Sequence, residues 1–151
     1  MRWGRAVILL FCFLSCSKDK INPSSNPGAT GLIFSNTTRW KVSDLVQNGT
    51  PIISSGNAVS NYIYLELNAS GQYISDNGIN ECNGRFTTDK MTTIDFEEGI
   101  SCTKVGGDLI SYQQFKETLT KDVVSFTVNS DTTSLTFSLN SETYIKLLRL
   151  K

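Results

Sequence analysis

Short segments in which apolar and polar residues alternate recur along this chain of 151 residues. In one of them, Ile63, Leu65 and Leu67 share a face, while Tyr64 and Glu66 point the other way. A two-residue period is typical of β-strands that bury one face. The other segments expected to be extended are 39–43, 72–75, 85–88, 91–96, 124–128, 135–139 and 144–150. The sequence therefore predicts a mainly β fold.

Turn-forming residues separate these segments. Asn-Gly pairs are strong turn signals because both residues tolerate the left-handed backbone conformation. The expected turns are at Asn48-Gly49, 68–71, Asn77-Gly78, Asp89-Lys90 and 129–131. Strands joined by such short turns are antiparallel neighbours. Seven or eight short antiparallel strands usually curl or close to cover their edges, so we expect a small barrel-like sheet.

One segment has a helical period instead. Leu109, Tyr112, Phe115 and Leu119 follow one another at spacings that place them on one face of a helix of about three turns. Asp108 precedes them and is a suitable N-cap, because its carboxylate can accept hydrogen bonds from the first-turn amides. The stripe is best explained by core packing. The predicted fold class is therefore α+β but mainly β: a small antiparallel barrel-like sheet of seven or eight strands with one packed helix.

The start of the chain has the layout of a secretory signal peptide. Arg2 and Arg5 supply the positive charge, and residues 6–14 form an uncharged apolar run of nine residues. This run is too short for the roughly 20 residues that span a bilayer as a helix. It ends in Leu14-Ser15-Cys16, which resembles a bacterial lipobox. The alternative is an ordinary signal peptide with an incidental cysteine.

The lipobox resemblance implies that residues 1–15 are removed and that Cys16 carries the lipid that anchors the protein in a membrane. Residues 16–35 contain prolines, glycines and few apolar side chains, which indicates a flexible tether. Residues 36–151 are then the folded domain. We expect a location in the bacterial cell envelope, at the outer membrane. Lys18-Asp19 also resembles the short signals of surface-exposed lipoproteins in Bacteroidota, which favours surface exposure.

Four cysteines are present, and two of them lie in the folded part. Cys82 and Cys102 form an even pair in a chain bound for an oxidising compartment, so we expect a disulfide. Closing a loop of about 20 residues stabilises the fold by about 3 kcal/mol in the chain-entropy treatment. Two buried free thiols or a metal pair are the alternatives. Two thiolates without histidine supply only half of a tetrahedral zinc site.

The composition argues against several functions. The chain has 14 basic and 14 acidic residues, which argues against nucleic-acid binding, and it has no histidine, the commonest general base. The sequence contains no Gly-x-Ser-x-Gly element, no phosphate-binding glycine loop and no EF-hand pattern. Asp95 and Glu97 would share a strand face, but a solvated edge explains them better than an acid–base pair. We therefore expect no enzymatic activity, catalytic residue, cofactor or metal site.

Several segments taken together resemble the META-domain family, the HslJ-like envelope proteins. They are Thr38-Arg39-Trp40-Lys41-Val42, the Cys82-Asn83 motif within 80–86, the segment 100–105 and the helix around 115–119. The resemblance implies a small secreted or envelope-anchored domain, linked to stress tolerance and secretion, with no shared catalytic residues or cofactor. Asn83-Gly84 in the second segment suits a left-handed turn or a bulge.

The resemblance and the residues together favour a non-enzymatic envelope lipoprotein that binds another envelope component or supports stress tolerance. The alternative is a lipocalin-like barrel that binds a small apolar ligand. Trp40 on the first strand and Arg149 on the last resemble the pair that closes the base of lipocalin barrels. An apolar cavity would favour the ligand-binding barrel, whereas a filled core would favour the lipoprotein that binds a partner. In both cases we expect Trp40 to be buried.

Overall fold

The computed structural model describes residues 31, 33–56, 62–97, 101–107, 109–122 and 124–151. The expected signal peptide, Cys16 and most of the expected tether lie outside these residues. The last residues assigned to the tether belong to the domain, because Ile33 and Phe34 are buried in its core. Both side chains are large and apolar, so burying them offsets the entropy of ordering this segment.

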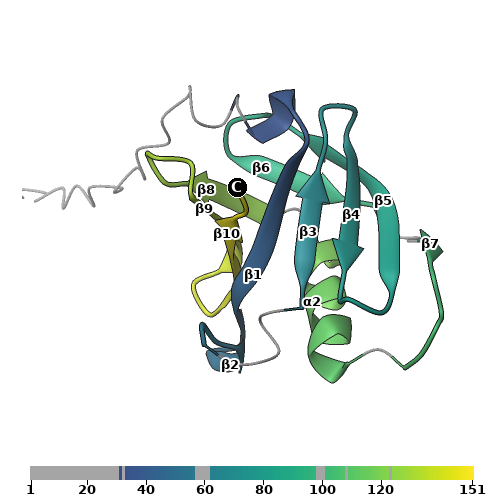
Figure 1. Ribbon diagram of the computed structural model, residues 1–151. Coiled ribbons are helices and arrows are strands. Elements are labelled where there is room, and N and C mark those ends of the chain that lie inside the picture. The colour runs from purple at the N-terminus through teal and green to yellow at the C-terminus, as the bar shows by residue number, and fades with distance from the viewer. Residues whose placement is uncertain (1–30, 32, 57–61, 98–100, 108, 123) are drawn as a thin grey trace, which may run out of the picture.

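Ten strands form one antiparallel sheet (Figure 1). Eight of them close into a barrel in the order β10-β9-β8-β6-β5-β4-β3-β1, with β1 pairing again with β10. Their bounds are β1 (Thr38–Gln47), β3 (Tyr64–Leu67), β4 (Gln72–Asp76), β5 (Glu81–Thr88), β6 (Thr93–Phe96), β8 (Val124–Val128), β9 (Ser134–Asn140) and β10 (Thr143–Arg149). The mainly β, barrel-like fold with one packed helix is confirmed.

Two further strands lie beside the barrel. β2 (Thr50–Ile53) pairs with the second half of β1, beyond the stretch that pairs with β3. β7 (Ser101–Cys102) pairs with the first half of β5, whose second half pairs with β6. The sequence did not predict β2, because Thr50-Pro51-Ile52-Ile53 does not alternate between apolar and polar residues. The sheet therefore has more strands than the seven or eight expected.

The turns follow the expected sequence signals. Asn48 and Gly49 both have positive φ, 49° and 73°, between β1 and β2. This is the conformation that a two-residue hairpin turn needs, and Asn-Gly adopts it at low cost. Gly78 also has positive φ, between β4 and β5. These turns fix the hairpin register and with it the face on which each side chain lies.

Inward-facing side chains fill the barrel. The ring of Phe96 lies 5.2 Å from that of Tyr73, 5.4 Å from that of Phe137 and 5.9 Å from that of Phe86, measured between centroids. The predicted alternation is confirmed on β3 and on the segment just before it, since Ile63, Leu65 and Leu67 are all fully buried. An eight-stranded barrel is narrow enough for its own side chains to fill it.

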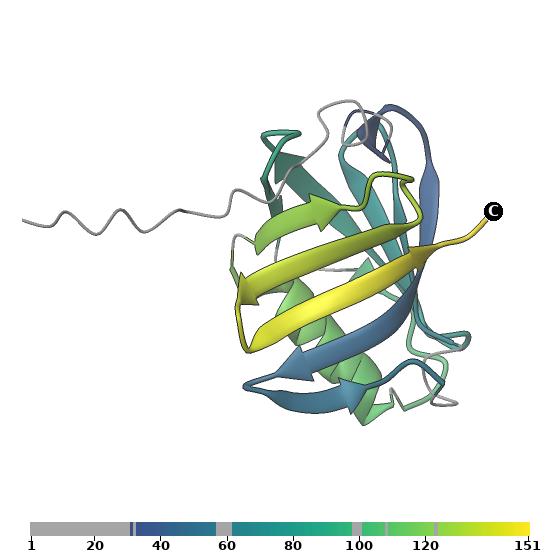
Figure 2. The same cartoon turned by 90° about the vertical axis from the view of Figure 1, so that its left-hand side faces the viewer.

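The two ends of the barrel are covered differently. At the N-terminal end, where β1 begins, residues 33–35 form a helical turn, and Phe34 packs against Phe86 and Phe126 at ring distances of 5.8 Å and 5.5 Å. At the opposite end, the helix end, α2 (Ile110–Thr120) lies across the opening. Figure 2 shows α2 behind the neighbouring strands β10 and β1. Both ends are therefore closed by segments outside the barrel strands.

The helix begins later than expected. Its N-cap is Leu109, which has an extended backbone and no side-chain cap hydrogen bond, while Asp108 lies outside the described residues. Tyr112, Phe115 and Leu119 are buried as predicted, but Leu109 is 43% exposed. Leu109 precedes the first helical turn, so its side chain does not follow the helical spacing.

Gly84 corrects the expectation of a turn or bulge at Asn83-Gly84. It lies within β5 with no positive φ, directly opposite Tyr73 on β4. A Cβ at this position would lie 2.8 Å from three atoms of the Tyr73 side chain, closer than real contacts allow. The glycine is needed because the phenol ring of Tyr73 lies over it.

Candidate functional site

The expected disulfide joins two neighbouring strands. Cys82 on β5 lies directly opposite Cys102 on β7, with a Cα–Cα distance of 4.1 Å, and the two are bonded. This confirms the predicted pairing. The bond attaches β7 to the barrel wall, and the segment 103–107 continues directly from it towards α2.

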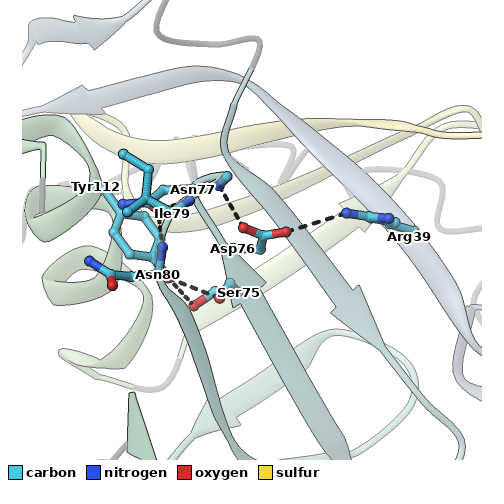
Figure 3. Close-up of polar contacts among 8 residues, drawn as sticks. Arg39, Ser75, Asp76, Asn77, Ile79, Asn80 and Tyr112 are labelled. Atoms are coloured by element: carbon cyan, nitrogen blue, oxygen red, sulfur yellow. Dashed lines mark hydrogen bonds and ion pairs between the residues drawn. The ribbon is translucent and has the colours of Figure 1, made fainter. Parts of the chain in front are cut away.

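The side chains of Asn77 and Asn80, which we call the amide clamp, fix the helix end (Figure 3). Asn77 Oδ1 accepts hydrogen bonds from the backbone N–H groups of Ile79 and Asn80, at 2.9 Å and 2.7 Å. Asn80 Oδ1 accepts from the N–H of Val105 at 2.9 Å, and Asn80 Nδ2 donates to the carbonyl of Gly106 at 3.1 Å. Both asparagines are buried. The amide clamp therefore attaches the β4–β5 turn to the segment after β7.

A second buried contact attaches the helix to the same turn. The hydroxyl of Tyr112 donates to the carbonyl oxygen of Ser75 at 2.9 Å and lies 3.1 Å from the Ser75 hydroxyl. Both side chains are fully buried. Because a buried polar group without a partner is costly, these bonds favour one position of α2 relative to β4.

On the outside of the turn, the charge of Asp76 is neutralised by Arg39 on β1, which reaches across β3. Its carboxylate accepts from the N–H of Gly78 at 2.6 Å and lies 3.5 Å from the Arg39 guanidinium, as Figure 3 shows. Arg39 also lies over the ring of Tyr64, with Cζ 4.8 Å from the centroid. These contacts leave little net charge beside the turn.

Around these buried contacts, large apolar side chains are exposed to solvent. We call five of them the apolar rim: Tyr62, Ile79, Val105, Leu109 and Ile110, with exposed fractions of 55%, 55%, 79%, 43% and 76%. The β4–β5 turn, the segment after β7 and the start of α2 all lie at the helix end in Figure 1. Apolar side chains gathered in this way are characteristic of interaction surfaces.

Two members of the apolar rim lie against the glycines of neighbouring segments. The ring of Tyr62 lies 3.9 Å from where a Cβ on Gly78 would be, and Cγ2 of Ile79 lies 3.7 Å from where one on Gly106 would be. The two glycines thus let the side chains lie close to the backbone of the neighbouring segments. Sequence analysis missed the apolar rim, although Ile79 after a turn glycine and Val105 before Gly106-Gly107 were visible signals.

An open cleft of about 490 Å³ lies outside the barrel, between α2 and the ends of β1, β9 and β10. Its lining is mostly polar, with Leu139 as the single aliphatic side chain. The lining residues are Gln47, Asn48, Glu117, Thr118, Thr120, Lys121, Leu139 and Thr143. Gln47 Nε2 donates to Thr118 Oγ1 at 2.6 Å, which ties β1 to the helix. The cleft is thus not the apolar cavity expected of a lipocalin-like barrel.

Trp40 lies at the N-terminal end and is fully buried, as predicted. Its Nε1 donates to Thr38 Oγ1 at 3.0 Å, and Thr38 Oγ1 donates to the carbonyl of Ile33 at 3.3 Å. Trp40 pairs with Arg149 across β1 and β10, and the Arg149 Cζ lies 6.0 Å from the ring centroid. As expected, these two residues lie side by side, at the N-terminal end.

Tyr73 carries an unusual polar atom inside the barrel. Its hydroxyl is buried and has no hydrogen-bond partner among the described residues. Burial raises the pKa of Tyr73 to about 12, with Tyr112 and Glu97 contributing in the same direction. Asp95 and Glu97 themselves lie exposed on and just after β6.

In the part of the chain that the structure describes, no group of three or more histidine, cysteine, aspartate or glutamate residues could hold a metal ion. Over the same residues, no helix has the length and apolar character needed to cross a membrane.

Comparison with known proteins adds one structural relative. No protein-family model matches the chain, and no curated protein does. The chain is similar to the NMR structure of a protein from Burkholderia xenovorans, with a TM-score of 0.60 and 18% sequence identity over 90% of this chain and 97% of the other. At this identity the likeness concerns the fold alone.

Proposed function

We propose that this chain is a non-enzymatic lipoprotein of the bacterial cell envelope with a META/HslJ-like domain, anchored through Cys16. On this proposal it acts by binding another envelope protein, not by holding a small ligand. The observation that carries the proposal is the contrast between a barrel filled by its own side chains and apolar side chains left in solvent outside it.

The filled barrel argues for a partner on the surface. Small-molecule sites are usually concave and largely apolar. Here the ring of Phe96 contacts those of Tyr73 and Phe137 in the interior. The cleft beside α2 is open and mostly polar. A partner protein, in contrast, needs only exposed apolar side chains held in place.

Anchoring through Cys16 agrees with the position at which the chain enters the domain. Ile33 and Phe34 are buried at the N-terminal end, so residues 17–30 connect Cys16 to that end. Fourteen residues span at most roughly 50 Å when fully extended. The domain would be held close to the membrane, with its N-terminal end nearer to the anchor.

The experiment labels growing cells with a radioactive fatty acid and treats intact cells with a crosslinker. We expect label in the wild-type protein and in Cys12→Ser, and none in Cys16→Ser. We also expect a discrete crosslinked adduct of the wild-type protein that decreases in Cys16→Ser, because the partner lies in the envelope. Cys12 is the matched control, since it lies within the expected signal peptide.

Label that persists in Cys16→Ser would contradict the anchor. A small apolar ligand found in equimolar amount by native mass spectrometry would favour the ligand-binding barrel.

A further inference from the structure

Resting on the proposed function, we propose that the apolar rim is the docking surface, and that its occupant is an apolar segment of a partner protein on the side away from the anchoring membrane. The surface comprises Tyr62, Ile79, Val105, Leu109 and Ile110. Neither the lipid anchor nor the fold requires these side chains to be exposed.

The first argument is that the surface is held rigid by buried groups. The amide clamp fixes the backbone of Ile79 and Val105 through hydrogen bonds of 2.9 Å to each N–H. The disulfide holds β7, and Tyr112 holds α2, close to the same turn. Buried polar groups thus hold two turns whose apolar side chains face solvent. Such preorganisation lowers the entropy lost when a partner binds.

The second argument is the direction that the surface faces. The chain enters the domain at Ile33 and Phe34, where the tether would begin, and the apolar rim lies at the opposite end of the barrel (Figure 1). When the protein is anchored through Cys16, the helix end is the far end. The apolar rim is then the part of the domain farthest from the point where the tether attaches, so the geometry favours a protein over lipid as its occupant.

The third argument concerns size and charge. Five partly exposed side chains make a patch of a few hundred Å², whereas a stable complex buries roughly 800 Å² on each partner. A second copy would bury this small patch twice, whereas an inserted segment of another protein can also contact the surrounding polar surface. Glu81 and Lys104 beside the patch are exposed and opposite in charge, and Asp76 is paired with Arg39. Binding should therefore depend little on salt concentration.

The experiment uses the full-length lipidated protein in cells, with a photo-crosslinking amino acid at Val105. The control positions are Met91, which is 61% exposed in the β5–β6 turn at the N-terminal end, and Thr127, which is exposed on β8. We expect one discrete adduct, larger than the chain and different from its dimer, from Val105 and not from the controls.

Adding Ile79→Asp to the protein that carries the photo-crosslinker at Val105 should reduce the adduct yield at least about tenfold, whereas Met91→Asp should not. Ile110→Ser, a milder change on the helix, should also reduce it, and thermal unfolding should show that each variant remains folded.

Five results would overturn the proposal. An adduct with the mass of two copies would identify a homodimer surface, and an adduct with lipid alone would identify a membrane surface. Equal adducts from Val105 with and without Ile79→Asp would show that the apolar rim is not the contact. If an adduct forms from Met91 or Thr127 instead, a protein partner exists and only the location is wrong. If none of these positions, nor general crosslinking, gives an adduct although the lipid label is present, the proposed function itself fails.

Discussion

The two ends of the barrel are closed by different kinds of contact. At the N-terminal end, Ile33 and Phe34 enter the core, and the hydrogen bonds from Trp40 to Thr38 and from Thr38 to Ile33 lie within it. At the helix end, the buried side chains of the amide clamp carry the hydrogen bonds, and the apolar side chains of Ile79 and Val105 lie outside. At the N-terminal end the hydrogen bonds lie beneath buried apolar side chains, whereas at the helix end several apolar side chains lie outside the buried amides.

This difference indicates that the N-terminal end contributes mainly to the stability of the fold. Apolar burial contributes about 25 cal/mol per Å², so a fold that leaves Ile79 and Ile110 in solvent forgoes stability that it could have gained. The N-terminal end also exposes Met91 and Leu148, but it buries Phe34 against the core. We therefore expect mutations at the N-terminal end to affect unfolding most, and mutations at the apolar rim to affect binding most.

The largest effect is expected at the N-terminal end from Trp40→Ala. Loss of the fully buried indole should lower the free energy of unfolding by about 3 to 5 kcal/mol, measured by urea denaturation of residues 17–151. Trp40 is the only tryptophan after Trp3, so native fluorescence of the wild-type domain should also be blue-shifted. Leu148→Ala, at a 40% exposed position on β10, is the control and should cost much less. Equal costs for the two variants would show that Trp40 does not anchor this end.

At the helix end, removing the disulfide should have the next largest effect. Cys82→Ala with Cys102→Ala should lower the free energy of unfolding by about 3 kcal/mol, because the unfolded chain regains the freedom of a loop of about 20 residues. Hydrogen exchange should also rise at the amide of Val105, which follows β7. Chemical reduction of the wild-type protein serves as the comparison. An unchanged unfolding midpoint after reduction would show that β7 is held by its other contacts.

Asn80→Ala tests the amide clamp directly. The change removes the acceptor of the Val105 amide and the donor to the Gly106 carbonyl. Groups left without partners in a partly buried site should cost about 1 to 3 kcal/mol. Asn83→Ala, at an exposed asparagine on β5, is the matched control and should be nearly neutral. Similar denaturation curves for both variants would argue against a structural role of the amide clamp.

The smallest effect at neutral pH is expected from Tyr73→Phe. The Tyr73 hydroxyl is buried without a partner, so its removal should be neutral or slightly stabilising. At high pH the variants should diverge. Burial raises the pKa of Tyr73 to about 12, so the unfolded chain ionises first, and the wild-type protein loses about 1.4 kcal/mol of stability per pH unit between about 10 and 12. Tyr73→Phe lacks this loss.

Denaturation of both proteins at pH 8 and pH 11 measures the difference. Tyr62→Phe, at an exposed tyrosine, controls for the general effect of alkali. A gap between wild type and Tyr73→Phe that stays constant with pH would show that this phenol is not held in its neutral form by the fold.

The sequence predicted the features that depend on local chemistry. The alternation at Ile63, Leu65 and Leu67 identified a strand and its buried face, and Asn48-Gly49 identified a turn with two positive φ angles. The Cys82–Cys102 bond followed from the even number of cysteines in the folded part. In each case the residue type itself limits the backbone or the environment.

The features that depend on distant contacts could not be predicted. Gly84 was expected in a turn because no local signal shows that Tyr73 lies over it. β2 has little pattern of its own and exists because β1 extends past the end of β3. The apolar rim combines residues from three segments, so only the folded arrangement shows that Ile79 and Val105 are held by the two buried side chains of the amide clamp, Asn77 and Asn80.

The pairing of β1 with β10 has a consequence for how the chain reaches this fold. Trp40 pairs with Arg149 and Val46 with Tyr144, so the barrel closes between residues about a hundred positions apart. Contacts of such long sequence separation slow folding, because the loop entropy is lost before the contacts form. During synthesis, β1 has no partner on this side until the last seven-residue strand has emerged. The barrel of the nascent chain therefore stays open until β10 has been synthesised.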